Sequence, residues 1–370
     1  MMKIKFSDPR IFVITIIWLM VLVFVGTVDQ KYIGLYQSQK KYFSSMILWI
    51  WYIPLPGGLL TMLILTLNLI AFFFKKNVWN KKKLGVLIVH FGSILLLIGG
   101  GLTYLFSNEG AMQLTTKNKK TNFIQSYHDK ELCVINLSEF KDSLEYTNFS
   151  DKILKIGNTL NFETLPFEMK VLNYCDNSRL IIDNKKDELH KGKMAKSYNF
   201  ECIKSEIENS ENKSAIKLLL KSIDSKSNDA DGIYISRLDP GQNVQKIDYN
   251  GFEYAVILQP KRTYLPFDIE LIEVTKINHP NSEIAKSYSS KVNVLDNNNI
   301  KRKLITMNNP LRFKGYTFYQ AHYEEEAGIK TSVLAVVKNY GRLFPYISSI
   351  IMCIGILIQI FIRMPRLFKK

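Results

Sequence analysis

A single histidine, His90, lies inside the apolar segments of this chain, within the stretch LGVLIVHFGS that spans residues 84–93. The four longest apolar segments contain no Asp, Glu, Lys or Arg and no second histidine. An ionisable side chain is costly at membrane depth and by default marks a site. A neutral imidazole can ligate a metal through one ring nitrogen while the other ring nitrogen makes a hydrogen bond. His90 is therefore the first candidate for chemistry.

Asn68 is the polar side chain that we expect beside His90. At 1.5 Å per residue, His90 lies about 9 Å inside its segment when counted from Leu84. Asn68 lies six residues before Phe74, where the preceding apolar segment ends. Because these two antiparallel segments are joined by only nine residues, Asn68 and His90 should lie at the same depth. We predict that Asn68 fixes the tautomer of His90. The alternative is a histidine that bonds to Asn68 or to a carbonyl and binds no ligand.

The orientation of His90 follows from the glycines of the same segment. Gly85, Gly92 and Gly99 recur every seven residues and form a stripe that allows close helix contact. At 100° per residue, His90 is rotated about 160° from Gly92, so it points to another helix, lipid or a ligand on the side of Ser93. An imidazole in this place is a suitable axial ligand for haem iron. One histidine fills one axial position, so haem binding requires a second ligand from elsewhere.

Four apolar segments are long enough to cross a membrane as helices, since about 20 residues are needed. They cover about residues 11–28, 57–74, 84–106 and 343–362, and a basic tail follows at 363–370. The first segment follows a short basic head, as in a signal peptide. It lacks a cleavage motif and further spans follow soon after it, so we expect it to be retained.

The positive charge of the chain is concentrated around the apolar segments. The formal net charge is +16, and 13 of these excess charges lie in residues 1–106 and 343–370. This distribution indicates membrane orientation and argues against nucleic-acid binding. The loop 75–83 contains five lysines and no acidic residue, so it should be cytoplasmic. The connections 29–56 and 107–342 then lie on the opposite side of the membrane, and both termini are cytoplasmic.

The first of these connections, residues 29–56, is unusually rich in aromatic residues and also contains lysines. This composition fits a helix that lies in the membrane interface. An ordinary aromatic belt before the next membrane span explains the composition equally well.

The long connection, residues 107–342, predicts a large, mostly antiparallel β domain. Short runs rich in Val, Ile, Tyr, Phe and Thr alternate with turn-forming clusters, and no long helical periodicity is present. The expected strands are Glu131–Leu137, Phe167–Tyr174, Ile216–Ile223, Phe252–Leu258, Phe267–Val274 and Tyr316–Tyr323.

A weak internal similarity favours a duplicated β unit in this domain. The stretch TLPFEMKVL at 164–172 resembles YLPFDIELI at 264–272, and MAKSY at 194–198 resembles IAKSY at 284–288. Two matches in the same order suggest repeat halves, here residues 131–223 and 232–323, with a seam at 224–231. Chance similarity is the alternative for such short matches.

The cysteines predict no metal or redox motif. Cys133, Cys175 and Cys202 lie in the β domain and Cys353 lies in the last apolar segment, without a CxxC pair. A disulfide among the first three fits an oxidising compartment, but we expect buried single thiols. The scattered His128, His190, His279 and His322 lack ligand spacing, and no hydrolase or phosphate-loop motif is present.

Several stretches, spread over essentially the whole chain, together resemble the ResB (CcsB) family, the large-domain component of the system II cytochrome c synthase. Residues 138–250 match only loosely. The matching stretches are Gly34–Phe43, Pro54–Gly58, Lys83–Gly92, Glu109–Gly110, Met307–Leu311, Gly315–Gln320 and Gly341–Ile347.

This resemblance implies a multi-span CcsA-type partner in the bacterial inner membrane, with the large domain extracytoplasmic. Haem b would be the transported substrate, attached to the CxxCH cysteines of apocytochrome c. No haem would be held tightly by this chain alone, and catalysis would lie largely in the partner. By the same resemblance, His90 corresponds to a transmembrane haem-ligating histidine. The alternative function is a membrane-anchored β-domain receptor or assembly scaffold without a cofactor, in which His90 is structural.

Overall fold

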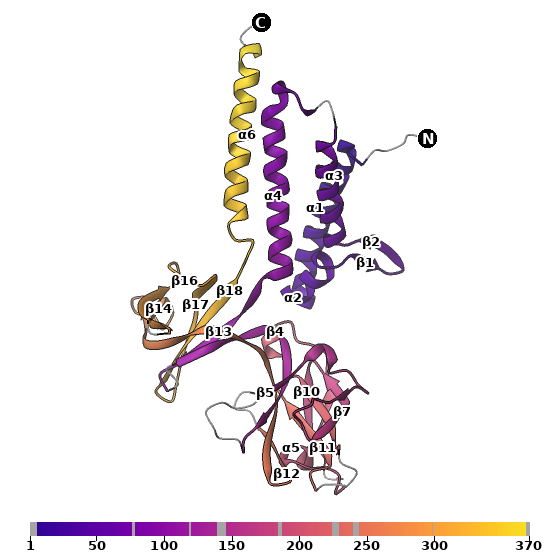
Figure 1. The fold of residues 1–370 in the computed structure, drawn as a ribbon, viewed down its shortest axis with the longest axis vertical. Helices are drawn as coiled ribbons and strands as arrows, with labels where there is room; N and C mark the ends of the chain where they lie inside the picture. Colours follow the sequence, from indigo (N-terminus) through magenta and orange to yellow (C-terminus); the bar gives the residue numbers. More distant parts are fainter. Residues whose placement is uncertain are drawn as a thin grey trace. The chain divides into compact units, whose positions relative to one another are not determined.

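The computed structural model divides the chain into two compact units. The first contains Met1–Asn108, Arg312–Thr317 and Val337–Lys370, and the second contains Glu109–Leu311 and Phe318–Val336. The first unit holds the apolar helices and the second holds most of the β-strands (Figure 1). The residues that the structure describes are 6–75, 78–117, 120–138, 146–183, 187–223, 229–239, 244–297 and 299–367.

Four apolar helices dominate the first unit: α1 (Pro9–Ile33), α3 (Gly58–Phe73), α4 (Leu84–Phe106) and α6 (Phe344–Leu367). Among the described residues, three helices are long and apolar enough to cross a membrane: α1, α6, and α4 with the 3₁₀ turn Lys81–Lys83 before it. The helix α3 is apolar over 16 residues, about 24 Å, whereas the hydrocarbon core is about 30 Å thick. The predicted membrane span at residues 57–74 therefore stays a prediction.

Local sequence explains where α1 begins and ends. The Asp8 side chain accepts a hydrogen bond from the backbone N–H of Arg10, and Pro9 occupies the first helical position. Gly34 ends the helix with φ 80°, a conformation that favours glycine. The helix therefore extends beyond the predicted 11–28 at both ends.

The predicted glycine stripe of α4 packs against α6. A Cβ atom at Gly92 would lie 2.6 Å from Cγ of Met352, so only glycine permits this approach. A Cβ atom at Gly85 would meet the backbone of Gly355, and one at Gly99 would meet the side chain of Phe344. Small residues therefore bring the two helices close together.

The connection 29–56 differs from the predicted interfacial helix. It forms the short helix α2 (Leu35–Ser38), the π-helical turn η1 (Gln39–Phe43), and then the hairpin β1 (Ile47–Ile50) and β2 (Ile53–Pro56). The β-branched and aromatic residues of β1 favour a strand, and the two prolines of β2 exclude a helix there.

The second unit is built on antiparallel sheets. The largest sheet has the strand order β15-β14-β13-β4-β3-β18-β17-β16, with β12 paired to β13 and β5 paired to β4. Its strands are β3 (Asn108–Thr115), β4 (Lys120–Asn136), β5 (Tyr146–Ser150), β12 (Gln245–Tyr249), β13 (Phe252–Asn278), β14 (Ala285–Asp296), β15 (Asn299–Thr306), β16 (Leu311–Phe313), β17 (Tyr316–Glu326) and β18 (Ile329–Lys338).

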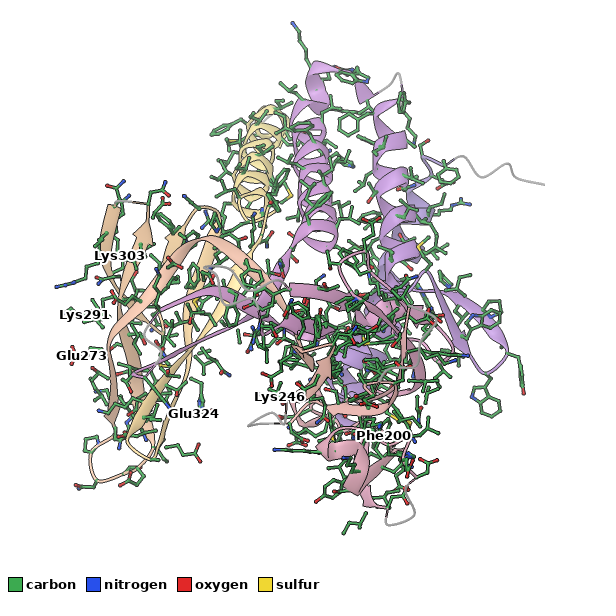
Figure 2. All side chains as sticks on the ribbon, turned by 60° about the horizontal axis from the view of Figure 1, so that its bottom comes forward. Phe200, Lys246, Glu273, Lys291, Lys303 and Glu324 are labelled. Atoms are coloured by element: carbon green, nitrogen blue, oxygen red, sulfur yellow. A yellow bond between two sulfur atoms is a disulfide. The ribbon has the colours of Figure 1, made fainter. Side chains whose placement is uncertain are left out.

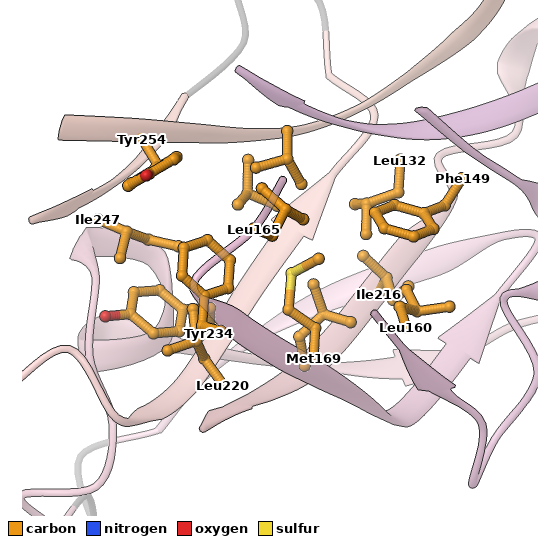
Figure 3. Close-up of a cluster of buried hydrophobic side chains, with 14 of the residues drawn as sticks. Leu132, Phe149, Leu160, Leu165, Met169, Ile216, Leu220, Tyr234, Ile247 and Tyr254 are labelled. Carbon is orange, nitrogen blue, oxygen red and sulfur yellow. The ribbon is translucent and has the colours of Figure 1, made fainter. Parts of the chain in front are cut away.

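A four-stranded sheet packs its apolar face into the main core of this unit, with the order β11-β10-β7-β6. Phe167, Met169 and Ile216 from this sheet meet Leu132 and Phe149 from the large sheet (Figure 3). The remaining elements are β8 and β9, which pair with each other, and the short helix α5. The bounds are β6 (Thr159–Leu160), β7 (Phe167–Cys175), β8 (Ser178–Ile182), β9 (Tyr198–Cys202), β10 (Ala215–Ser222), β11 (Gly232–Arg237) and α5 (Lys193–Ser197).

All six expected strands are confirmed, but two of them are parts of one strand. The predicted strands 252–258 and 267–274 both lie within β13, which is 27 residues long. The pairing of β13 with β4 shifts register between Pro260 and Arg262 and again between Tyr264 and Ile269. Because proline has no N–H to donate, such irregularities are expected where it enters a sheet.

The predicted duplication is not confirmed. The stretches at 164–172 and 264–272 lie in β7 and β13, which belong to different sheets. The stretch at 194–198 forms α5 with the first residue of β9, whereas 284–288 lies mostly in the strand β14. Most of the proposed seam lies outside the described residues.

The expectation of single thiols is wrong for two of the cysteines. Cys175 and Cys202 form a disulfide with a Cα–Cα distance of 5.4 Å, because the ends of β7 and β9 lie side by side. Cys133 is a buried free thiol as predicted, and burial raises its pKa to about 12. Cys353 is also free.

Candidate functional site

The imidazole of His90 is oriented by its own helix. Its Nδ1 lies 2.8 Å from the backbone carbonyl oxygen of Val86, one turn earlier in α4. A carbonyl oxygen only accepts, so Nδ1 carries the proton in this bond. In the neutral ring, Nε2 then keeps its lone pair, which is the form that binds a metal.

An aromatic side chain on α3 holds the face of this ring. Phe72 stacks on His90 with ring centroids 4.0 Å apart and ring planes 14° from parallel. The backbone bond to Val86 and this stacking restrain the half-buried imidazole from two directions. An imidazole held in this way is ready to ligate with little loss of rotational freedom.

The predicted pairing of Asn68 with His90 is not formed. The buried Asn68 amide donates to the carbonyl oxygens of Phe6, at 2.6 Å, and Asp8, at 3.1 Å. The residue on α3 that meets His90 is Phe72, one turn further along the helix. The prediction assumed that α3 ends at the level where α4 begins, but α3 stops short of that level (Figure 1). The Val86 carbonyl, rather than Asn68, fixes the tautomer.

His90 lines a cavity of about 590 Å³ between α4 and α6. This volume falls within the range of small-molecule sites, about 300–1,000 Å³. The α6 side is a helical stripe that repeats every three or four residues. The lining residues are Val86, Val89, His90, Ile356, Gln359, Ile360, Arg363 and Met364.

The polar side chains that line this cavity differ in how many of their hydrogen-bonding groups already have partners within the protein. The amide of Gln359 joins the two helices: its Oε1 accepts from the Val86 N–H and its Nε2 donates to the Lys82 carbonyl, each at 3.2 Å. His90 keeps one ring nitrogen for a ligand, and Arg363 contributes a guanidinium. The cavity thus combines apolar walls, one metal-binding nitrogen and one cation.

The apolar run in the sequence did not predict that Arg363 and Met364 of α6 line this cavity. That run ends at Ile362, so residues 363–370 were assigned to a tail. The helix continues to Leu367 and keeps Arg363 and Met364 on the same stripe as Ile356 and Ile360. Helical spacing beyond the last apolar residue was the signal that could have found Arg363.

The β-sheets of the second unit contain a smaller hollow of about 310 Å³ on β13, β14 and β15. Lys291, Lys303 and Glu273 lie at this face (Figure 2), and Arg302 adds a further positive charge. Within the described residues, no group of three His, Cys, Asp or Glu side chains could hold a metal. The face is a charged surface.

A buried pair in the second unit, Lys130 and Ser214, resembles a catalytic Lys–Ser dyad but lies away from solvent. Lys130 Nζ donates to Ser214 Oγ, and burial lowers the pKa of Lys130. Ser214 is completely buried and donates in turn to the carbonyl oxygen of Asp176 at 2.7 Å. A nucleophile must reach its substrate, so we interpret this pair as a satisfied core network.

Comparison with known proteins agrees with the resemblance found in the sequence. Residues 234–332, from β11 to β18, match the ResB-like family. This part of the chain is therefore similar to the ResB-like family. The chain is also 21% identical over 316 residues to the protein NrfI of Wolinella succinogenes, an alignment that covers 83% of this chain and 30% of NrfI. The chain thus spans about a third of the length of this relative.

Proposed function

We propose that this ResB-like chain is the haem-binding membrane component of a system II cytochrome c synthase. With a CcsA-type partner, it carries haem b across the bacterial inner membrane and supports attachment of the haem to the CxxCH cysteines of apocytochrome c. The observation that carries this proposal is His90, with its Nδ1 bonded to Val86 and its Nε2 left to ligate iron beside an apolar cavity.

The groups that this chain supplies indicate which roles are left to the partner. His90 offers one axial ligand, and haem iron takes two, so the second ligand comes from the partner or from a small molecule. The catalytic groups for thioether formation also belong largely to the partner. The antiparallel sheets of the second unit offer the surface on which apocytochrome c is received.

The direction of transport follows from the charges. The lysine-rich loop 75–83 is adjacent to the start of α4, and His90 lies near that end of the helix. By the positive-inside rule, this end faces the cytoplasm. Haem that enters there reaches His90 first and then moves outward toward the extracytoplasmic domain.

The test is haem content in the copurified complex of this chain with its CcsA-type partner. We expect a haem absorption band whose intensity His90→Ala lowers strongly and added imidazole restores, because imidazole replaces the lost ligand. His279→Ala is the matched control and should leave the band unchanged.

Two results would overturn the proposal. One is a complex that contains no haem although cytochrome c matures normally. The other is a His90→Ala variant with an unchanged spectrum and a normal yield of cytochrome c. Either result would favour the alternative function, a membrane-anchored β-domain scaffold without a cofactor.

A further inference from the structure

The cavity beside His90 carries a positive charge that the proposed function has not used. Arg363 lies on α6, on the stripe that also presents Ile356 and Ile360 to the cavity. Within the described residues, its guanidinium forms no hydrogen bond or salt bridge, whereas the amide of Gln359 is occupied by Val86 and Lys82. Arg363 is exposed at the edge of this cavity, so its guanidinium is accessible to an anionic group of a bound ligand.

The helix packing places Arg363 at one end of the cavity. Gly85 faces Gly355 and Gln359, and Gly92 faces Met352, so the antiparallel packing places His90 at about the depth of Met352 to Ile354. Arg363 is about ten residues further along α6, which is nearly three turns or about 15 Å along the helix axis. The metal-binding nitrogen and the guanidinium are therefore separated along the cavity, with apolar side chains between them.

An iron porphyrin presents the matching pattern of groups. Its iron needs a nitrogen ligand, its macrocycle needs apolar walls, and one edge bears two propionate carboxylates. An arginine fork donates up to five N–H groups and binds carboxylates in pairs of parallel hydrogen bonds. A lysine offers only a point charge without this planar match.

We propose that Arg363 binds the propionate carboxylates of the haem whose iron is ligated by His90. This inference rests on the proposed function. It sets the direction of the bound haem: the propionate edge faces the C-terminal end of α6, and the opposite edge points into the helix layer. It also makes the site selective for porphyrins with free carboxylates.

The experiment compares haem with haem dimethyl ester, in which both carboxylates are blocked. Each is titrated into the haem-depleted complex of this chain and its partner, and binding is followed by absorbance. We expect wild type to prefer haem about tenfold, and Arg363→Gln to bind both ligands as weakly as wild type binds the ester. Arg363→Lys should keep part of the preference, because it keeps the charge.

Controls separate this role from other effects of charge. Lys81→Gln removes an exposed positive charge near the same membrane boundary and should keep the full preference. The absorption band of haem bound to Arg363→Gln should keep its wild-type position, because His90 still ligates the iron.

Two outcomes would overturn the inference. In one, Arg363→Gln keeps the wild-type preference for haem over the ester. In the other, it weakens both ligands equally or lowers the amount of chain in the membrane, as expected of an arginine that binds lipid phosphate. Failure of the proposed function looks different: wild type would then bind neither ligand, or His90→Ala would bind both normally.

Discussion

At the scale of single residues, the candidate site combines His90, which the sequence singles out, with Phe72 and Arg363, which it does not. His90 could be found because an ionisable residue inside an apolar segment is rare and costly. The choice of Asn68 as its partner failed because the chain offers Asn68 the carbonyl groups of Phe6 and Asp8 instead. Depth along a helix can be counted from sequence, but the offset between two helices depends on tertiary packing.

Phe72 gives a prediction at this scale. Its ring covers one face of the His90 imidazole, so Phe72→Leu removes the stacking contact while keeping an apolar side chain. We expect haem occupancy of the purified complex to fall a few-fold, since such contacts are worth about 0.5–1.5 kcal/mol. Phe72→Tyr keeps the ring and should keep most of the haem.

The matched control for this prediction is Phe73→Leu. Phe73 is the next residue of α3, and it makes edge contacts with Phe72 and Trp79. Haem content per complex is measured for all three variants. If Phe73→Leu lowers haem as much as Phe72→Leu does, the effect belongs to general packing of α3 rather than to stacking on His90.

At the scale of elements, sequence periodicity predicted those helices and strands that local sequence determines. The glycine stripe of α4 and the six expected strands are present because spacing and composition determine them locally. The sequence did not predict that 252–258 and 267–274 form one strand, because the segment between them contains Pro260 and Pro266 and proline usually interrupts a strand. The similar stretches at 194–198 and 284–288 adopt different structures, because tertiary context overrides weak local preferences.

Gly85 gives a prediction at the scale of helix packing. A Cβ atom there would meet the backbone of Gly355 and Gln359, which cannot move aside as a flexible side chain can. We expect Gly85→Ala to separate α4 from α6, lower the stability of the complex by about 1–3 kcal/mol, and reduce haem binding in the cavity between them.

Gly100→Ala is the control for this prediction. It lies on the same helix, and a Cβ atom added there meets nothing within 4 Å. Thermal unfolding and haem content of the two variants in detergent are compared with wild type. Equal destabilisation by both variants would show that close contact between α4 and α6 is not what requires glycine at position 85.

At the scale of the whole molecule, the number of membrane crossings decides where the β domain lies. Among the described residues, three helices are long enough to span, whereas the apolar helix α3 is only 16 residues long. A short span can be accommodated by local thinning of the bilayer and by flanking Lys and Trp side chains. Lys75 and Trp79 follow α3, and the indole of Trp79 donates to the carbonyl oxygen of Phe73. The lysine-rich loop 75–83 also favours the cytoplasmic side, so we expect α3 to cross.

Labelling with a membrane-impermeant maleimide tests this count in spheroplasts of cells that produce the chain with Cys133 and Cys353 replaced by serine. If α3 crosses, Trp79→Cys should react only after permeabilisation, and Glu211→Cys in the β domain should react in intact spheroplasts. If α3 does not cross, loop 75–83 stays outside with residues 29–56, α4 returns the chain inward, and the two reactivities are exchanged. That exchange would place the β domain in the cytoplasm. It would also remove the route by which an exported apocytochrome could meet haem carried past His90.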